Sequence, residues 1–287
     1  VIGGANGEVE EQVPVDRILL KNGQFEAKID KAVFDEARAL DFIGKNTGGS
    51  AASIYVDEPP GDEPDEIAVE VPDASMQLLA DNDNDIEVRT DYASILIDNV
   101  ELRKMTDNAL DLYFRLVPVR DANEQSMINS GVRNDANVQA AASGKSFDIL
   151  GSSLKIETNY SGYKTLLTIY FEKNGIAVPG GNEAEFLASL RVHIDHGDGS
   201  PTEVVEEFDP VYEGGRLVGL SFEIERFSTF TILQLRDFRN LTEGSFTTVT
   251  LADPLSGLGQ IVSAVIDASR QAIVLELDAE NYRVDGE

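Results

Sequence analysis

The chain of 287 residues has no cysteine and no tryptophan. Without cysteine, disulfide bonds, thiolate catalysis, iron–sulfur clusters and cysteine-ligated zinc are excluded. Carbohydrate-binding modules usually stack sugar rings on aromatic side chains, so the missing tryptophan, with only 8 tyrosines, counts against that class. These absences remove several catalytic and binding chemistries before any motif is considered.

Basic residues are also scarce, with 23 Lys and Arg against 52 Asp and Glu, a formal charge of -29. Nucleic-acid backbones and anionic lipid surfaces would be repelled, because both are bound mainly through Lys and Arg. No apolar run approaches the roughly 20 residues needed to span a bilayer, and the first residues lack the features of a signal peptide. We predict no nucleic-acid partner and no membrane insertion, and we expect a mature protein or a fragment of a longer one.

Hydrophobic residues make up 42% of the chain, enough to offset the conformational entropy lost on folding. The length predicts two or three domains. The pattern predicts a mainly β fold with an α+β amino-terminal part and β-sandwich modules. We expect a linker at residues 1–14, an α+β domain at 15–145, a β-sandwich at 146–236, and a partial immunoglobulin-like unit or terminal strands at 237–287.

The amino-terminal part alternates short strands with helices. A tight turn at Asn22-Gly23 should join two strands, and Asp30 is the expected N-cap of a helix over residues 30–40. A second helix is predicted at 73–80, and further strands at 52–56, 67–71, 86–89, 93–97 and 110–119. Residues 121–145 are polar and predict a long loop that contacts a partner, or a hairpin excursion with a short helix at 138–142.

From residue 146 onward the pattern is almost purely that of strands. We expect them at 154–158, 166–171, 190–194, 204–208, 217–224 and 229–235, a spacing typical of a sandwich. The alternation of buried and exposed positions shifts near residues 226–228. This shift predicts that the chain moves from one sheet to the other there.

Two segments of this half carry a family resemblance. Residues 192–208 read VHIDHGDGSPTEVVEEF and residues 226–235 read RFSTFTILQL. They resemble the β-rich modules found beside cell-wall-anchoring domains in surface-layer and related surface proteins of Gram-positive bacteria. The resemblance implies a secreted, non-catalytic structural or adhesive module at the cell surface or cell wall, with neighbouring copies, other domains of the same protein or wall polysaccharide as partners.

Two clusters of acids are candidate metal sites, one at residues 81–87 and one in the acidic loop at residues 57–66, whose acids are more typical of solvated loop residues. Asp81, Asp83, Asp85 and Glu87 alternate with other residues, as oxygen ligands of calcium often do. The EF-hand pattern is not met, because the sixth and twelfth positions counted from Asp81 are Ile86 and Tyr92. The cluster predicts a calcium site of another kind, or a turn that ends the preceding helix. Calcium is the only cofactor that the sequence indicates.

Both histidines of the chain and Ser228 carry side chains that could take part in catalysis. His193 and Asp195 should share a strand face, with His196 pointing away or lying in the next turn, which leaves too few convergent ligands for catalytic zinc. Arg226, Phe227 and Ser228 resemble the His-Phe-Ser tripeptide of autoproteolytic domains. An arginine cannot act as the base there, because the guanidinium does not lose its proton. The sequence therefore assigns no catalytic residue and indicates that the protein is not an enzyme.

Two other functions remain open. The chain could be a polysaccharide-binding accessory region of a secreted carbohydrate-active enzyme, with Tyr160, Tyr163 and Tyr170 as an aromatic platform. It could also be a sandwich domain that cleaves itself before Ser228, which an intact-mass measurement would test.

Overall fold

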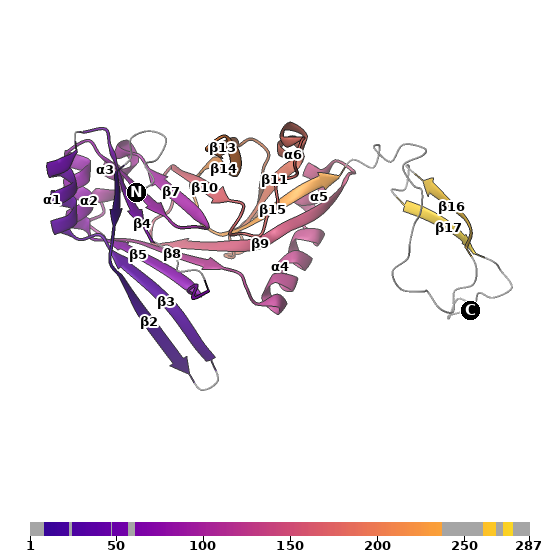
Figure 1. The fold of residues 1–287 in the computed structure, drawn as a ribbon, viewed down its shortest axis with the longest axis horizontal. Coiled ribbons are helices and arrows are strands. Elements are labelled where there is room, and N and C mark those ends of the chain that lie inside the picture. Colours follow the sequence, from indigo (N-terminus) through magenta and orange to yellow (C-terminus); the bar gives the residue numbers. More distant parts are fainter. Residues whose placement is uncertain are drawn as a thin grey trace.

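The computed structural model describes residues 9–22, 25–46, 48–56, 61–236, 261–267 and 272–277. Two mixed β-sheets dominate these residues, and helices lie toward both ends of the body that the sheets form (Figure 1). The largest buried side chains, including Phe34, Phe114 and Phe230, belong to one hydrophobic core to which both sheets contribute. The predicted mainly β fold, with an α+β amino-terminal part and a sandwich-like arrangement of sheets, is confirmed.

The first sheet has seven strands, of which three come from the amino-terminal end and pair in parallel. The other neighbours are antiparallel. In spatial order the strands are β1 (Val9–Gln12), β4 (Ala51–Tyr55), β6 (Asp85–Arg89), β7 (Ala93–Ile97), β10 (Thr165–Tyr170), β14 (Arg216–Ile224) and β13 (Asp209–Glu213).

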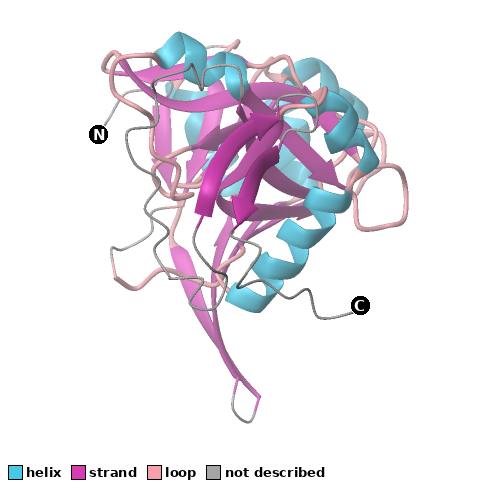
Figure 2. Ribbon diagram, turned by 90° about the vertical axis from the view of Figure 1, so that its right-hand side faces the viewer, coloured by secondary structure: helices cyan, strands magenta, loops and turns pink. Residues whose placement is uncertain are grey.

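The second sheet has eight strands and is antiparallel except where β3 pairs with β5. In spatial order the strands are β12 (Glu203–Val205), β11 (Leu190–Asp195), β15 (Thr229–Arg236), β9 (Ser146–Thr158), β8 (Leu112–Pro118), β5 (Glu66–Val71), β3 (Phe25–Val33) and β2 (Val15–Asn22). The hairpin of β2 and β3 extends away from the body in both views (Figures 1 and 2).

Aspartate side chains begin most of the helices. Asp35, Asp98, Asp121 and Asp135 each accept a hydrogen bond from a backbone N–H of the first turn, which satisfies a donor that the helix itself cannot pair. The helices are α1 (Glu36–Lys45), α2 (Asp73–Asp81), α3 (Asn99–Thr106), α4 (Ala122–Asn134), α5 (Ala136–Ala142) and α6 (Glu183–Ser189). No described helix is long and apolar enough to cross a bilayer.

The helix predicted at residues 30–40 begins later than expected. Asp30 is not an N-cap: it lies buried in β3, where its carboxylate binds the guanidinium of Arg17 on β2. Residues 29–32 are paired on both sides, with β2 and with β5, so the backbone stays extended there. The true cap is Asp35, at the start of α1.

The long loop predicted at residues 121–145 is wrong, since α4 and α5 occupy most of it. The alternative, a hairpin excursion with a short helix, is closer to the structure, because β8 and β9 on either side pair in antiparallel fashion. Asp135 both follows α4 and caps α5 with two hydrogen bonds, which allows a sharp bend between the helices.

The predicted domain boundaries do not divide the core. Strands from before and after residue 145 contribute to each sheet, as the pairs β7·β10 and β8·β9 illustrate. The linker predicted at residues 1–14 contains β1, which pairs with β4. Within residues 237–287 the structure describes only the antiparallel pair β16 (Ile261–Asp267) and β17 (Ala272–Leu277), so the rest of the predicted immunoglobulin-like unit lies outside the described residues.

The predicted shift near residues 226–228 is confirmed as a change of sheet. β14 belongs to the seven-stranded sheet and β15 to the eight-stranded sheet, so residues 225–228 carry the chain across the core. Ser228 lies at the end of this crossing.

Candidate functional site

The side chains of His196, Glu203 and Ser228 meet at the start of β15, in the eight-stranded sheet. β11 pairs with β15 so that Asp195 lies opposite Thr229, which brings His196 beside Ser228. β12 pairs on the other side of β11, with Glu203 opposite Ile194. The strand register therefore brings together residues that are 7 and 32 positions apart in the sequence.

The imidazole of His196 lies between a hydroxyl and a carboxylate. Its Nδ1 is 2.6 Å from Ser228 Oγ and its Nε2 is 3.0 Å from Glu203 Oε1. The His196 side chain is 3% exposed, whereas that of Glu203 is 58% exposed. Ser228 is itself buried. The arrangement joins a shielded hydroxyl and imidazole to a carboxylate at the surface.

The hydrogen-bonding capacity of these groups determines where the protons lie. An ionised carboxylate only accepts hydrogen bonds, so Glu203 favours the tautomer in which His196 Nε2 carries the proton. In neutral imidazole, Nδ1 is then an acceptor, and it competes with the carbonyl oxygen of Phe227 for the single proton of the Ser228 hydroxyl. This is the relation between nucleophile, base and orienting group that nucleophilic catalysis uses.

Ser228 Oγ also touches the backbone of the preceding residue. The hydroxyl donates a hydrogen bond to the carbonyl oxygen of Phe227, and the two oxygens are 2.5 Å apart. The flanking residues are anchored: the Phe227 ring packs edge-on against Phe114 with centroids 5.3 Å apart, and Arg226 forms a 2.6 Å ion pair with Asp198. The peptide bond before Ser228 is therefore held on both sides next to the hydroxyl.

The tripeptide at residues 226–228 places the base for Ser228 at position 226, where the sequence has an arginine. The structure supplies an imidazole from residue 196 instead, in the turn after β11. His196 does lie in the turn that the sequence predicted, but its ring is buried toward Ser228. The signal that could have revealed it was the pairing of the predicted strands 190–194 and 229–235, whose register the sequence does not specify.

The other histidine is buried against a different acid. His193 Nε2 lies 3.6 Å from Asp135 Oδ2, and the residue is 3% exposed. Burial lowers the pKa of His193, although Asp135 acts in the opposite direction. Burial alone would raise the pKa of Asp135, but hydrogen bonds from Thr202 and from the N–H groups of Val138 and Asn137 lower it. Asp195 instead accepts a hydrogen bond from the N–H of Gly197, so these residues do not form one site.

Three of the four acids of the predicted calcium site each have a different partner. Asp83 pairs with Arg103 at 2.7 Å, Asp85 accepts a hydrogen bond from the N–H of Asn99, and Glu87 accepts one from the Ser53 hydroxyl. Burial raises the pKa of Asp85. Asp81 is exposed at the end of α2. Among the described residues, no three His, Asp or Glu side chains are grouped closely enough to hold a metal ion, and calcium remains a prediction.

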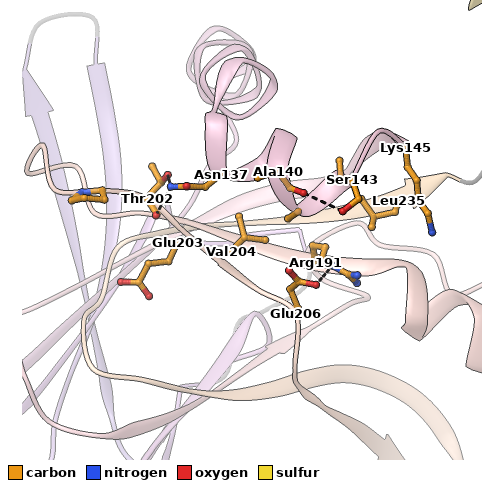
Figure 3. Close-up of a pocket in the computed structure, with 13 residues that line it drawn as sticks. Asn137, Ala140, Ser143, Lys145, Arg191, Thr202, Glu203, Val204, Glu206 and Leu235 are labelled. Atoms are coloured by element: carbon orange, nitrogen blue, oxygen red, sulfur yellow. Dashed lines mark hydrogen bonds and ion pairs between the residues drawn. The ribbon is translucent and has the colours of Figure 1, made fainter. Parts of the chain in front are cut away.

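A pocket of about 830 Å³ is lined by residues of α5, β11 and β12, and Glu203 is one of them (Figure 3). Its polar groups pair with one another: Asn137 binds the hydroxyl of Thr202, and Arg191 lies 3.2 Å from Glu206. Glu203 lines the pocket, but its side chain points away from Asn137 in Figure 3. We therefore locate the candidate chemistry at His196 and Ser228, outside this pocket.

The β2–β3 hairpin forms a second candidate site, for interaction with another protein chain. β5 pairs only with Ile29–Val33 of β3, so the tip of the hairpin extends beyond the sheet. Ile18, Leu19 and Leu20 on β2 are 41%, 50% and 53% exposed. β2 is also the last strand of its sheet, which leaves its outer backbone edge without a neighbouring strand among the described residues.

The three tyrosines considered as an aromatic platform do not share one exposed face. Tyr160 is buried, and its hydroxyl donates to the carbonyl of Leu110. Burial raises the pKa of Tyr160 to about 12. Its ring packs edge-on against Tyr163, whereas Tyr170 lies beneath the guanidinium of Arg89. This arrangement is typical of core packing.

No protein-family model, curated protein or solved structure matches the chain.

Proposed function

We propose that the chain is a non-catalytic structural and adhesive module of a secreted bacterial cell-surface protein, of the surface-layer type, in which neighbouring copies associate. The location at the cell surface or wall rests on the resemblance of residues 192–208 and 226–235. The association rests on one structural observation: the apolar edge strand β2 has no outer neighbour among the residues that the structure describes.

The edge of β2 differs from the other edges of the two sheets. Proteins usually protect such edges by short strands, proline or charge. β12 has 3 residues and β1 has 4, and β13 contains Pro210 together with acidic residues. β2 has 8 residues and no proline, and its charged residues Asp16, Arg17 and Lys21 flank three consecutive exposed apolar side chains. An unprotected edge of this kind favours pairing with another strand.

The apolar centre of β2 can pair with itself, whereas Arg17 of each copy would lie opposite Lys21 of the other, which weakens the pair. In an antiparallel pair with its two-fold axis at Leu19, Ile18 of each copy lies opposite Leu20 of the other, and the two Leu19 residues face each other. Burying the exposed half of each side chain would contribute about 1 kcal/mol. Association costs offset much of the total, so we expect a dissociation constant of roughly 10 to 1000 µM. Such weak contacts suit a module that is also linked within a larger assembly.

Sedimentation velocity over a range of concentrations tests the proposal. We expect a monomer–dimer equilibrium that strengthens with added salt, because salt screens the repulsion between chains of charge -29. Leu19→Lys should weaken dimerisation at least tenfold, since two like charges would meet at the axis. Met127→Lys is the matched control: Met127 is 69% exposed on α4, far from β2 in sequence, and its replacement should leave the equilibrium unchanged.

Three results would contradict the proposal. The chain could remain monomeric at millimolar concentration, both variants could weaken association equally, or Leu19→Lys could leave it unchanged. A monomer whose β2 amides are already protected from hydrogen exchange would instead indicate that another part of the same chain occupies the edge.

A further inference from the structure

The hydroxyl of Ser228 contacts two groups, an imidazole and a backbone carbonyl, whereas one partner would be enough to satisfy its proton. Its oxygen lies 2.6 Å from Nδ1 of an imidazole that also contacts Glu203, and its hydroxyl donates a hydrogen bond to the carbonyl oxygen of its own preceding residue. Rotation about the carbon–oxygen bond of the side chain turns the hydroxyl proton from that oxygen toward Nδ1. A hydroxyl in this position has an electrophile within the same chain. Because Ser228 and the ring of His196 are buried, access for a separate large substrate is restricted, which favours an intramolecular reaction.

We propose that Ser228 and His196 cleave the chain between Phe227 and Ser228, with Glu203 as a positioning residue. Ser228 Oγ attacks the carbonyl carbon of Phe227 while its proton passes to His196 Nδ1. The tetrahedral intermediate then breaks its carbon–nitrogen bond, and His196 returns the proton to the departing Ser228 nitrogen. The product is an ester between Phe227 and Ser228 Oγ, with a free amine at Ser228.

Water completes the reaction. It adds to the ester carbonyl, the carbon–Oγ bond breaks, and the proton released by the water ends on the Ser228 hydroxyl. One water molecule is consumed, and the two chains end at Phe227 and begin at Ser228. The event occurs once in each molecule, so it is compatible with a structural module that has no separate substrate.

The fold predicts that cleavage does not separate the products. The chain beginning at Ser228 contains β15, which is hydrogen-bonded to β9 on one side and β11 on the other. Phe230, Ile232 and Leu233 of β15 are buried in the body. The two chains should therefore migrate together in native size-exclusion chromatography and separate only under denaturing conditions.

Intact mass spectrometry of the purified full chain tests the proposal, with and without hydroxylamine at neutral pH. We expect fragments ending at Phe227 and beginning at Ser228. Hydroxylamine should accelerate their formation and leave a hydroxamate on Phe227, because it attacks the ester faster than water does. The hydroxamate identifies the ester without relying on any variant.

Variants assign the roles. Ser228→Ala should abolish cleavage, and His196→Gln should slow it at least a hundredfold, within the usual contribution of a general base. Glu203→Gln should slow it less, and Glu203→Asp should restore part of the rate, because a carboxylate can again orient the ring of His196. The matched control is Ser221→Ala, another buried serine, whose hydroxyl binds Thr168 and which should leave the rate unchanged.

The proposal fails if the wild-type chain stays intact through prolonged incubation with hydroxylamine. It also fails if the new amino terminus is not Ser228, or if a Ser228→Ala variant with native circular dichroism is cut at the same rate. If that variant does not fold, the hydroxamate on wild-type Phe227 decides the question: its presence supports the proposal and its absence overturns it.

Discussion

The pair of Arg17 and Asp30 should contribute strongly to stability, because it lies at the base of the projecting β2–β3 hairpin. Two guanidinium nitrogens lie 2.6 and 2.7 Å from the two carboxylate oxygens, and a third contact joins Arg17 to Asp62. The hydrogen bond to Asp30 is the main reason that the pKa of Arg17 is raised. The Asp30 side chain is 2% exposed and that of Arg17 is 25% exposed. The pair therefore links β2 and β3 through a buried carboxylate, and Arg17 adds a contact to Asp62.

Asp30→Asn keeps the shape of the side chain and removes its charge. Breaking a buried ion pair typically costs about 3 to 5 kcal/mol, and we expect about 3 kcal/mol here because Arg17 is partly exposed and keeps Asp62. For a domain of this size, each kcal/mol lowers Tm by about 2 to 4 °C, which gives a decrease of about 6 to 12 °C. Thermal melting and urea unfolding, each followed by circular dichroism, measure the change.

The same hairpin provides a matched control in Glu26→Gln. The Lys21–Glu26 pair is 3.3 Å long, and its side chains are 65% and 51% exposed, so its loss should cost no more than about 0.5 kcal/mol. Arg17→Met should be at least as harmful as Asp30→Asn, since it leaves a buried carboxylate without its main partner. Equal effects of Asp30→Asn and Glu26→Gln would refute the argument from burial.

Two further predictions concern backbone space and pH. Gly151 has a φ of +58°, and a Cβ there would lie 2.1 Å from the carbonyl oxygen of Asn174, so Gly151→Ala should cost more than about 2 kcal/mol. At Gly131 in α4 a Cβ meets open space, so Gly131→Ala should raise the free energy of unfolding by up to about 1 kcal/mol. A urea-unfolding free energy that changed in the same direction for both variants would contradict this. Because burial lowers the pKa of His193 despite Asp135, protonation favours the unfolded chain, so stability should fall as pH drops below about 6.5, by at most about 1.4 kcal/mol per pH unit. Unfolding measured from pH 8 to 5 should show a shallower fall for His193→Gln, and identical slopes would count against the explanation.

Most strands were predictable because alternation of apolar and polar residues is a local property. The two strands around Asn22-Gly23 and the change of sheet near residue 227 follow from such patterns. Asp30 was misread because an acid before an apolar stripe looks the same whether it caps a helix or pairs with a distant arginine. Only the pairing of β3 with β2 and β5 shows that Asp30 lies in a strand and not at the start of a helix. The helices in residues 121–145 were missed because short polar helices carry little apolar periodicity.

The candidate chemical site was half visible in the sequence. The tripeptide at residues 226–228 indicates Ser228, but it places the base at the neighbouring position 226. His196 and Glu203 join it only because β15 pairs with β11 and β11 pairs with β12. The acids at 81–87 illustrate the opposite error, since closeness along the chain did not give them a common centre.

Composition and local alternation were sufficient to establish a cysteine-free, strongly acidic, mainly β protein with apolar strand faces. The single core shared by residues on both sides of position 145, the free edge of β2 and the meeting of His196 with Ser228 were decided by the tertiary structure. The physical reason is that strand propensity acts between neighbours in sequence, whereas strand order and register depend on contacts between distant residues.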